Sequence, residues 1–118
     1  MQYIELKGMA DLSKDLTAAS SIPLILSILA KGENYGYEII RQVGLLSDGR
    51  IQWTDGMLYP VLHKLEQRGL IQSDWRLADD TGRKRKYYRL TDKGLAQMGT
   101  EKAQWSLVYV TMLKLWAG

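Results

Sequence analysis

The alternation of apolar and polar positions along the chain predicts short helices followed by a hairpin. In the middle of the sequence, the apolar positions of one helix face fall at Leu58, Val61, Leu62 and Leu65. Gly69 follows this stripe at the position of a C-terminal cap. We therefore expect a helix that begins after Thr54 or Asp55 and packs one side on a core.

The residues after this helix predict two strands. Apolar and polar side chains alternate from Ile71 to Leu77, which is the period of a half-buried strand, and Trp75 falls on its apolar side. Polar residues 79–82 then form a turn, and a second strand-like segment follows over residues 83–91. A helix packed on a core and followed by a hairpin is typical of a winged helix.

A first helix is expected near the N-terminus. Ser20 or Ser21 can cap it, Pro23 falls in its first turn, and its apolar positions occupy two faces before Gly32 ends it. Residues 1–20 are weakly patterned and are expected to form an arm or a short helix.

A second helix is expected over about residues 36–46, and residues 51–53 are extended enough to supply a short strand. The predicted fold class is mainly α with a small β-hairpin. Residues 21–91 would form a winged helix-turn-helix domain that binds DNA.

The last helix is expected to run from Asp92 to Trp116, capped by Thr91, so that residues 92–118 form a dimerisation helix. Nine of its last twelve residues before Ala117 are apolar, and its own small domain could not cover them all. The run is shorter than the roughly 20 residues of a membrane span. A second subunit is the expected cover, and the alternative is a helix buried in a monomer. The expected seam contains Trp105, Val108, Tyr109, Met112 and Trp116.

The net charge of +3 hides an uneven distribution. Of the 16 basic side chains, five lie at Arg83, Lys84, Arg85, Lys86 and Arg89, so 11 remain elsewhere against 13 acidic ones. Short basic clusters are usually just solvated. Here the cluster lies in a hairpin beside a candidate recognition helix, which favours binding to a polyanion such as double-stranded DNA.

The third helix carries local features that point to DNA contact. Pro60 falls beyond the first turn and removes a helical hydrogen bond, and Gly56 leaves room for a ligand to approach the backbone. We expect the outward side chains Met57, Tyr59 and His63 to approach base edges or sugars. Lys64 and the wing cations should contact phosphates, and Thr54 at the start of the helix is also expected to lie at the DNA.

Several chemistries are excluded. The chain has no cysteine and a single histidine, His63, which cannot assemble a zinc site or a convincing catalytic triad. Gly94 and Gly99 have the spacing of a phosphate loop without its Lys-Ser/Thr end. We therefore expect no enzyme, metal or cofactor. No secretory signal or membrane span is visible, so a cytoplasmic protein is expected.

Characteristic segments of the PadR family of bacterial transcriptional regulators resemble three parts of this chain: NYGYEIIRQV, GMLYPVLHKLEQRGLI and GRKRKYYRLTDKG. The resemblance covers about residues 21–94 and is similar to the family's shorter subgroup, which has one C-terminal helix. It implies a dimeric repressor that binds a palindromic operator. By position, Tyr37, Tyr59, Lys64 and residues 83–86 match family residues near DNA.

The position of Trp105 in the expected seam suggests a ligand site. Paired indole rings across a two-fold axis would offer flat faces to a planar aromatic effector, especially a cation. Some PadR members resemble this arrangement, with a tryptophan lining a pore between subunits. The alternative is that Trp105 fills the dimer core.

Two other functions stay open on the sequence. The chain could be a winged helix used only as a protein-interaction module, although the concentration of cations in one hairpin opposes this. It could also bind a small molecule without binding DNA, for which the seam aromatics alone would suffice.

Overall fold

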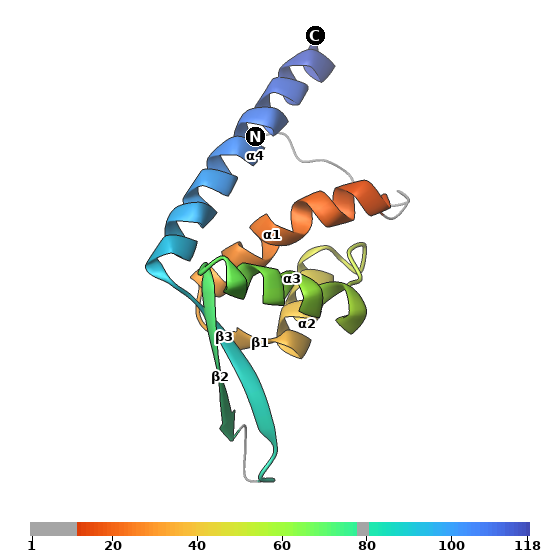
Figure 1. The fold of residues 1–118 in the computed structure, drawn as a ribbon. Helices are drawn as coiled ribbons and strands as arrows, with labels where there is room; N and C mark the ends of the chain where they lie inside the picture. Colours follow the sequence, from red (N-terminus) through yellow and green to blue (C-terminus); the bar gives the residue numbers. More distant parts are fainter. Residues whose placement is uncertain (1–11, 78–80) are drawn as a thin grey trace.

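The computed structural model describes residues 12–77 and 81–118 of the chain. Its helices and strands follow the order helix, short strand, two helices, two strands and a long helix (Figure 1). Their bounds are α1 Lys14–Ala30, β1 Asn34–Tyr35, α2 Gly36–Leu46, α3 Asp55–Gln67, β2 Ile71–Leu77, β3 Lys84–Leu90 and α4 Asp92–Ala117.

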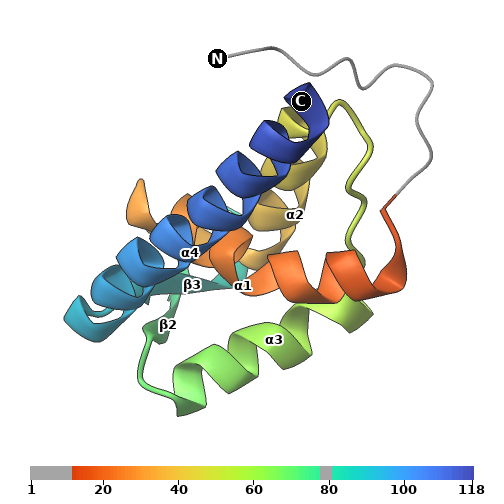
Figure 2. The same ribbon diagram turned by 90° about the horizontal axis from the view of Figure 1, so that it is seen from above.

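The molecule is elongated because two elements leave the helical core in opposite directions. Its extents are 56 × 32 × 24 Å. The wing formed by β2 and β3 projects from one end, and α4 projects from the other (Figure 1). Seen from above, α4 runs across α1, against which it packs (Figure 2). The predicted winged helix followed by a long C-terminal helix is confirmed.

The core lies between α1, α2, α3 and the base of the sheet. The apolar stripe predicted for α3 is confirmed, because Leu58, Leu62 and Leu65 are fully buried and Val61 is partly buried. Burial of one such side chain stabilises a fold by about 1.5–3 kcal/mol. The core also contains Ile25, Leu26, Ile28, Leu29, Ile39, Val43, Trp53, Leu70, Ile71 and Tyr88.

Both ends of α3 are formed by the residues that the sequence predicts. The Thr54 hydroxyl accepts a hydrogen bond of 3.3 Å from the Met57 N–H. Gly69 has a φ of +75°, which favours glycine, and the Leu70 N–H donates to the Leu65 carbonyl at 3.0 Å. Pro60 lies inside the helix. The cap and the glycine fix where α3 begins and where the wing starts.

The predicted start of the first helix is wrong. Ser13 caps α1 by accepting the Leu16 N–H at 3.1 Å, so Ser21 and Pro23 lie inside the helix. The helix continues through Pro23 because the apolar residues after it are buried, and this burial offsets the lost hydrogen bond. The expected boundary at residue 20 therefore falls within α1, and residues 1–11 of the expected arm lie outside the described residues.

The predicted short strand was placed wrongly. Residues 51–53 form no strand, and Trp53 is buried in the core instead. The extra strand is β1, which pairs with β3 so that the sheet order is β1-β3-β2. Contact between the rings of Tyr35 and Tyr87, 5.5 Å apart, accompanies this pairing. The turn expected over residues 79–82 lies partly outside the described residues.

The start of α4 is fastened to the turn between α3 and β2. The Thr91 side chain caps the helix by accepting the Gly94 N–H at 3.0 Å, as predicted. The Thr91 N–H donates to the Leu70 carbonyl at 3.1 Å. A β-carbon on Gly94 would lie 1.9 Å from that same carbonyl oxygen, so the two segments could not approach this closely with any other residue. No helix in the described part of the chain is long and apolar enough to cross a membrane.

Candidate nucleic-acid interface

A concave groove of about 660 Å³ separates the wing from the start of α2 and from α3. The four cationic residues 83–86, which are Arg83 and the first three residues of β3, lie at its rim. The rest of its lining is mostly aromatic and consists of Tyr35, Gly36, Tyr37, Tyr59, Trp75 and Tyr88. Cations beside aromatic side chains are the combination that nucleic-acid binding surfaces use.

Gly36 positions one wall of the groove. A β-carbon at Gly36 would lie 2.5 Å from the Tyr59 hydroxyl oxygen, which is far inside van der Waals contact. The missing side chain therefore lets Tyr59 of α3 pack against the first residue of α2. Tyr37 follows directly and is 68% exposed. Two tyrosines from different helices thus line the same side of the groove.

The register of the hairpin divides the wing into two faces. Trp75 pairs with Lys86 and Leu77 pairs with Lys84, so these four side chains share the face that continues from the groove. Ser73 lies on the same face and donates a hydrogen bond of 2.5 Å to Glu66 of α3. We call this the groove face and the opposite side of the sheet the outer face.

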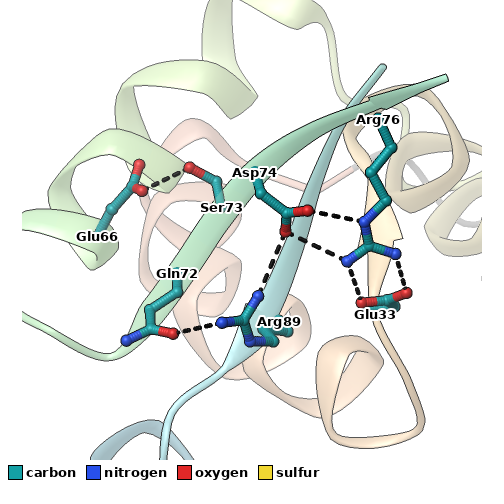
Figure 3. Close-up of polar contacts among 7 residues, drawn as sticks. All are labelled: Glu33, Glu66, Gln72, Ser73, Asp74, Arg76 and Arg89. Carbon is teal, nitrogen blue, oxygen red and sulfur yellow. Dashed lines mark hydrogen bonds and ion pairs between the residues drawn. The ribbon is translucent and has the colours of Figure 1, made fainter. Parts of the chain in front are cut away.

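Ion pairs neutralise two arginines of the outer face, Arg76 and Arg89. Arg76 lies between Glu33 and Asp74 and donates hydrogen bonds to both carboxylates, including one of 2.7 Å to each (Figure 3). Arg89 donates to Asp74 at 3.3 Å and to Gln72 at 2.8 Å. The hydrogen bonds from Arg76 lower the pKa of Glu33 and of Asp74. Two cations and two anions therefore largely cancel on this face.

Two tyrosine rings of the outer face lie against arginine guanidinium groups. The Arg85 guanidinium lies 4.4 Å from the centre of the Tyr35 ring, and the Arg76 guanidinium lies 4.9 Å from that of Tyr87. Tyr35 and Tyr87 meet edge to face. Arg85 is therefore held against the sheet by a cation–π contact, although its residue also borders the groove.

The lysines of the groove face have no such compensation. Neither Lys84 nor Lys86 forms an ion pair with a carboxylate of residues 12–77 or 81–118. The Lys86 ammonium lies 5.6 Å from the centre of the Tyr88 ring. Tyr88 itself is buried, and this burial raises the pKa of its phenol to about 12. The groove face is thus the cationic side of the wing.

The structure brings together only part of the predicted DNA-binding set. Tyr37, Tyr59 and residues 83–86 line the groove. The other predicted residues lie along α3 outside the groove lining, and all but the partly buried Met57 are exposed: Thr54, Gly56, Met57, Pro60, His63 and Lys64. A β-carbon on Gly56 would have its nearest neighbour at 3.9 Å, so packing does not require glycine there.

Sequence reasoning missed four residues of the groove lining, namely Tyr35, Gly36, Trp75 and Tyr88. The most consequential is Trp75, which the alternation placed on the half-buried side of its strand. It is 65% exposed because the wing extends beyond the helices that could cover it. Its place between two charged neighbours and opposite a basic strand was the available signal.

The second candidate surface is α4. Of the predicted seam, Val108 is 53% and Trp116 is 66% exposed, while Tyr109 and Met112 are half-buried. Trp105 borders a cavity of about 430 Å³ between α1 and α4. Leu16, Pro23 and Leu24 of α1 also line this cavity, together with Glu101 and Lys102.

A helical core that carries a basic two-stranded wing and an exposed recognition helix defines a winged-helix protein of the kind that regulates transcription. The sequence profile of the Transcriptional regulator PadR-like family matches residues 25–100. The chain therefore belongs to this family, and the resemblance noted from its sequence is confirmed. The family consists of transcriptional regulators, and the Escherichia coli relative and the two solved structures described below carry the same description.

Known relatives and solved structures agree with this assignment. An uncharacterised protein from Lysinibacillus sphaericus is 32% identical over 85 residues, which are 72% of this chain and 77% of that protein. The transcriptional regulator YqjI of Escherichia coli is 28% identical over 72% of this chain, but only 39% of its own length is matched.

Two solved structures show the similarity of the folds. The PadR-like transcriptional regulator from Bacillus cereus is 31% identical with a TM-score of 0.78, covering 89% of this chain and 99% of that one. A transcriptional regulator from Clostridium thermocellum is 29% identical with a TM-score of 0.77, covering 87% of this chain and 96% of that one.

Proposed function

We propose that this protein is a cytoplasmic, sequence-specific repressor that binds a palindromic DNA operator as a homodimer. The observation that carries the proposal is the groove between wing and helices, where Lys84 and Lys86, which form no ion pair among the described residues, lie beside the exposed Tyr37 and Tyr59. The part of the chain before Thr91 would bind DNA, and α4 would hold the dimer.

In this proposal α3 enters the major groove. Its outward side chains Met57, Tyr59 and His63 would approach base edges or sugars, and Lys64 would contact a phosphate. Thr54 and Gly56 at the helix start, and Pro60 one turn later, would let backbone approach the DNA strand closely. The strand between the major and minor grooves would then lie in the 660 Å³ groove, beside Tyr37 and the cations of residues 83–86.

The proposed dimer follows from the exposed apolar surface of α4. Large apolar side chains of its last three turns remain in contact with solvent, including the seam residues Val108 and Trp116. A second copy of the same helix is the simplest cover. Two recognition helices related by a two-fold axis would reach half-sites about one helical turn, roughly 34 Å, apart.

Selection of bound sequences from a random duplex pool tests this function. We expect the purified full chain to enrich an inverted repeat whose half-sites are spaced by about one helical turn. A reporter gene placed behind that sequence should lose expression when the protein is supplied. Failure to enrich any sequence would contradict the proposal, and would favour an interaction module or a small-molecule-binding protein that does not bind DNA.

We also propose that the repressor responds to a planar aromatic cation bound beside Trp105. The supporting observation is the 430 Å³ cavity between α1 and α4, which is lined by the Trp105 indole and the Glu101 carboxylate, with Lys102 also at its border. An aromatic face and an anion both favour a delocalised cation. Because the cavity separates the DNA-binding helices from α4, a bound effector would change the angle of α4 and release the operator.

Titration of a planar aromatic cation, such as proflavine, into the protein without DNA tests the effector site. Trp105→Ala and Glu101→Gln are each expected to weaken binding at least about tenfold, which corresponds to about 1.4 kcal/mol. Sedimentation must first show that both variants still dimerise. Equal affinities in all three proteins would leave Trp105 as a packing residue.

A further inference from the structure

The groove face of the wing carries an apolar row that the proposed function does not use. Trp75 and Leu77 of β2 are 65% and 67% exposed, and they alternate with the charged residues of the outer face. Their cross-strand partners are Lys86 and Lys84. Exposure of a tryptophan and a leucine side by side is costly in water, so a partner surface is expected to cover them.

The charge pattern of the wing identifies the kind of partner. Each apolar side chain has a lysine directly opposite, at the roughly 4.5–5.5 Å separation of cross-strand pairs. The surface they form is a narrow apolar ridge beside two lysines that form no ion pair with the part of the chain that the structure describes. The minor groove of DNA has the complementary form, with a floor of base edges between walls of phosphate. An apolar protein partner would not require the cations, and an acidic one would not require the ridge.

We infer that Trp75 and Leu77 contact the minor-groove floor beside the operator half-site and select base pairs without a guanine 2-amino group. This inference rests on the proposed DNA-binding function. In the minor groove, A·T and T·A pairs show only acceptors, whereas G·C adds the projecting N2 amino group. Contact of that amino group with an indole or isobutyl side chain would remove its hydrogen bond to water without a replacement.

The position of the ridge on the wing allows its side chains to reach the floor of the minor groove. The groove is about 6 Å wide, so the side chains at the edge of the wing can enter it while the two-stranded ribbon itself cannot. Lys84 and Lys86 would then lie along one phosphate wall. On the outer face, by contrast, Arg76 and Arg89 are paired with Glu33 and Asp74, and the Arg85 guanidinium lies over the Tyr35 ring.

Three versions of the flanking base pairs test the inference. The selected operator is prepared with A·T, G·C or inosine·cytosine pairs at the positions reached by the wing, and the full chain is titrated against each. Inosine lacks the 2-amino group but keeps the major-groove edge of guanine. We expect A·T and inosine·cytosine flanks to bind alike and G·C flanks to bind about tenfold more weakly, within the range of a mismatched pair.

Variants assign the discrimination to the ridge. The double variant Trp75→Ala/Leu77→Ala should bind all three duplexes with one affinity, while Leu46→Ala, an exposed apolar residue far from the wing, should discriminate like the wild type. Lys84→Ala/Lys86→Ala should weaken binding to all three duplexes by the same factor and keep the preference.

The outcomes separate this inference from the function on which it rests. If no duplex binds, the proposed function fails. If the wild type binds all three equally, DNA binding stands and the inference is overturned, whether or not a variant folds. Discrimination that persists in the folded Trp75→Ala/Leu77→Ala protein also overturns it, and would assign the ridge to a protein partner.

Discussion

At the scale of single residues, Tyr88 joins the wing to the core. Its ring is 3% exposed, and its strand continues directly into the cationic part of the wing. Burial favours the neutral phenol and raises the pKa of Tyr88 from its ordinary 10.0 to about 12. The native state therefore holds this proton at pH values where the unfolded chain has released it.

This shift predicts a loss of stability in alkali. The contribution of Tyr88 is fully present below about pH 10 and is lost as the pH rises towards about 12, because the unfolded state ionises first. Urea unfolding of wild type and Tyr88→Phe at about pH 8 and about pH 11 measures it. From about pH 8 to about pH 11, the free energy of unfolding should fall more for the wild type than for the Tyr88→Phe variant. An equal fall in both proteins would contradict this role of Tyr88.

At the scale of elements, the wing separates neutralised cations from available ones. The four basic residues at 83–86 border the groove, whereas Arg76 and Arg89 are held in ion pairs on the outer face. Only cations that meet phosphates release counterions from DNA. The wing's share of the salt dependence of binding should therefore come from residues 83–86, in addition to the share of Lys64 in α3.

Alanine at all four positions 83–86 tests this. Each lost phosphate contact lowers the slope of log affinity against log salt by about 0.9, so the slope should fall by up to about 3.6 and all sequences should bind more weakly. A control protein loses the same charge away from the wing through Lys14→Ala, Lys31→Ala, Lys102→Ala and Lys114→Ala. Its slope should stay near that of wild type. Equal slopes in the wing variant and the wild type would remove the wing from the electrostatic contact.

The elements differ in how far their sequences determine them. The structure confirms the bounds predicted for α2 and β2, and α3 follows its cap at Thr54 and its glycine at Gly69, because local patterns and end signals agree there. The start of α1 was missed because Pro23 looked like a first-turn proline, while packing carries the helix through it. The strand β1 was missed because two residues are too few to show a period. Its partner strand also lies more than fifty residues away in the sequence, so no local pattern indicates the pairing.

The candidate site was harder to predict than the fold. Basic residues 83–86 were recognised from charge alone, but only pairing across the hairpin reveals which side chains share a face. Trp75 illustrates the difficulty, since alternation assigns a residue to one face of a strand and does not say whether another element covers that face. Gly36 has an ordinary sequence setting, and its role depends on Tyr59 from another helix.

At the scale of the whole molecule, α4 should hold two subunits together. The variant Val108→Glu/Met112→Glu places two charges in the expected seam, and burial of unpaired charges would be strongly unfavourable. Sedimentation should show a monomer or a dimer at least about tenfold weaker, a loss of about 1.4 kcal/mol. The control Thr111→Glu/Lys114→Glu alters exposed polar positions of the same helix and should remain dimeric. An undiminished dimer in the seam variant would place the interface elsewhere.

The fastening of α4 at its first turn has a mechanical consequence. Thr91 and Gly94 fix the helix on the Leu70 carbonyl, directly after the turn that ends the recognition helix. The 26 residues of α4 form a rod about 39 Å long. If α4 tilts about its first turn by about 5°, its far end is displaced by about 3 Å. In the proposed dimer, the way in which the far ends of the two α4 helices meet would therefore set the separation of the two copies of α3.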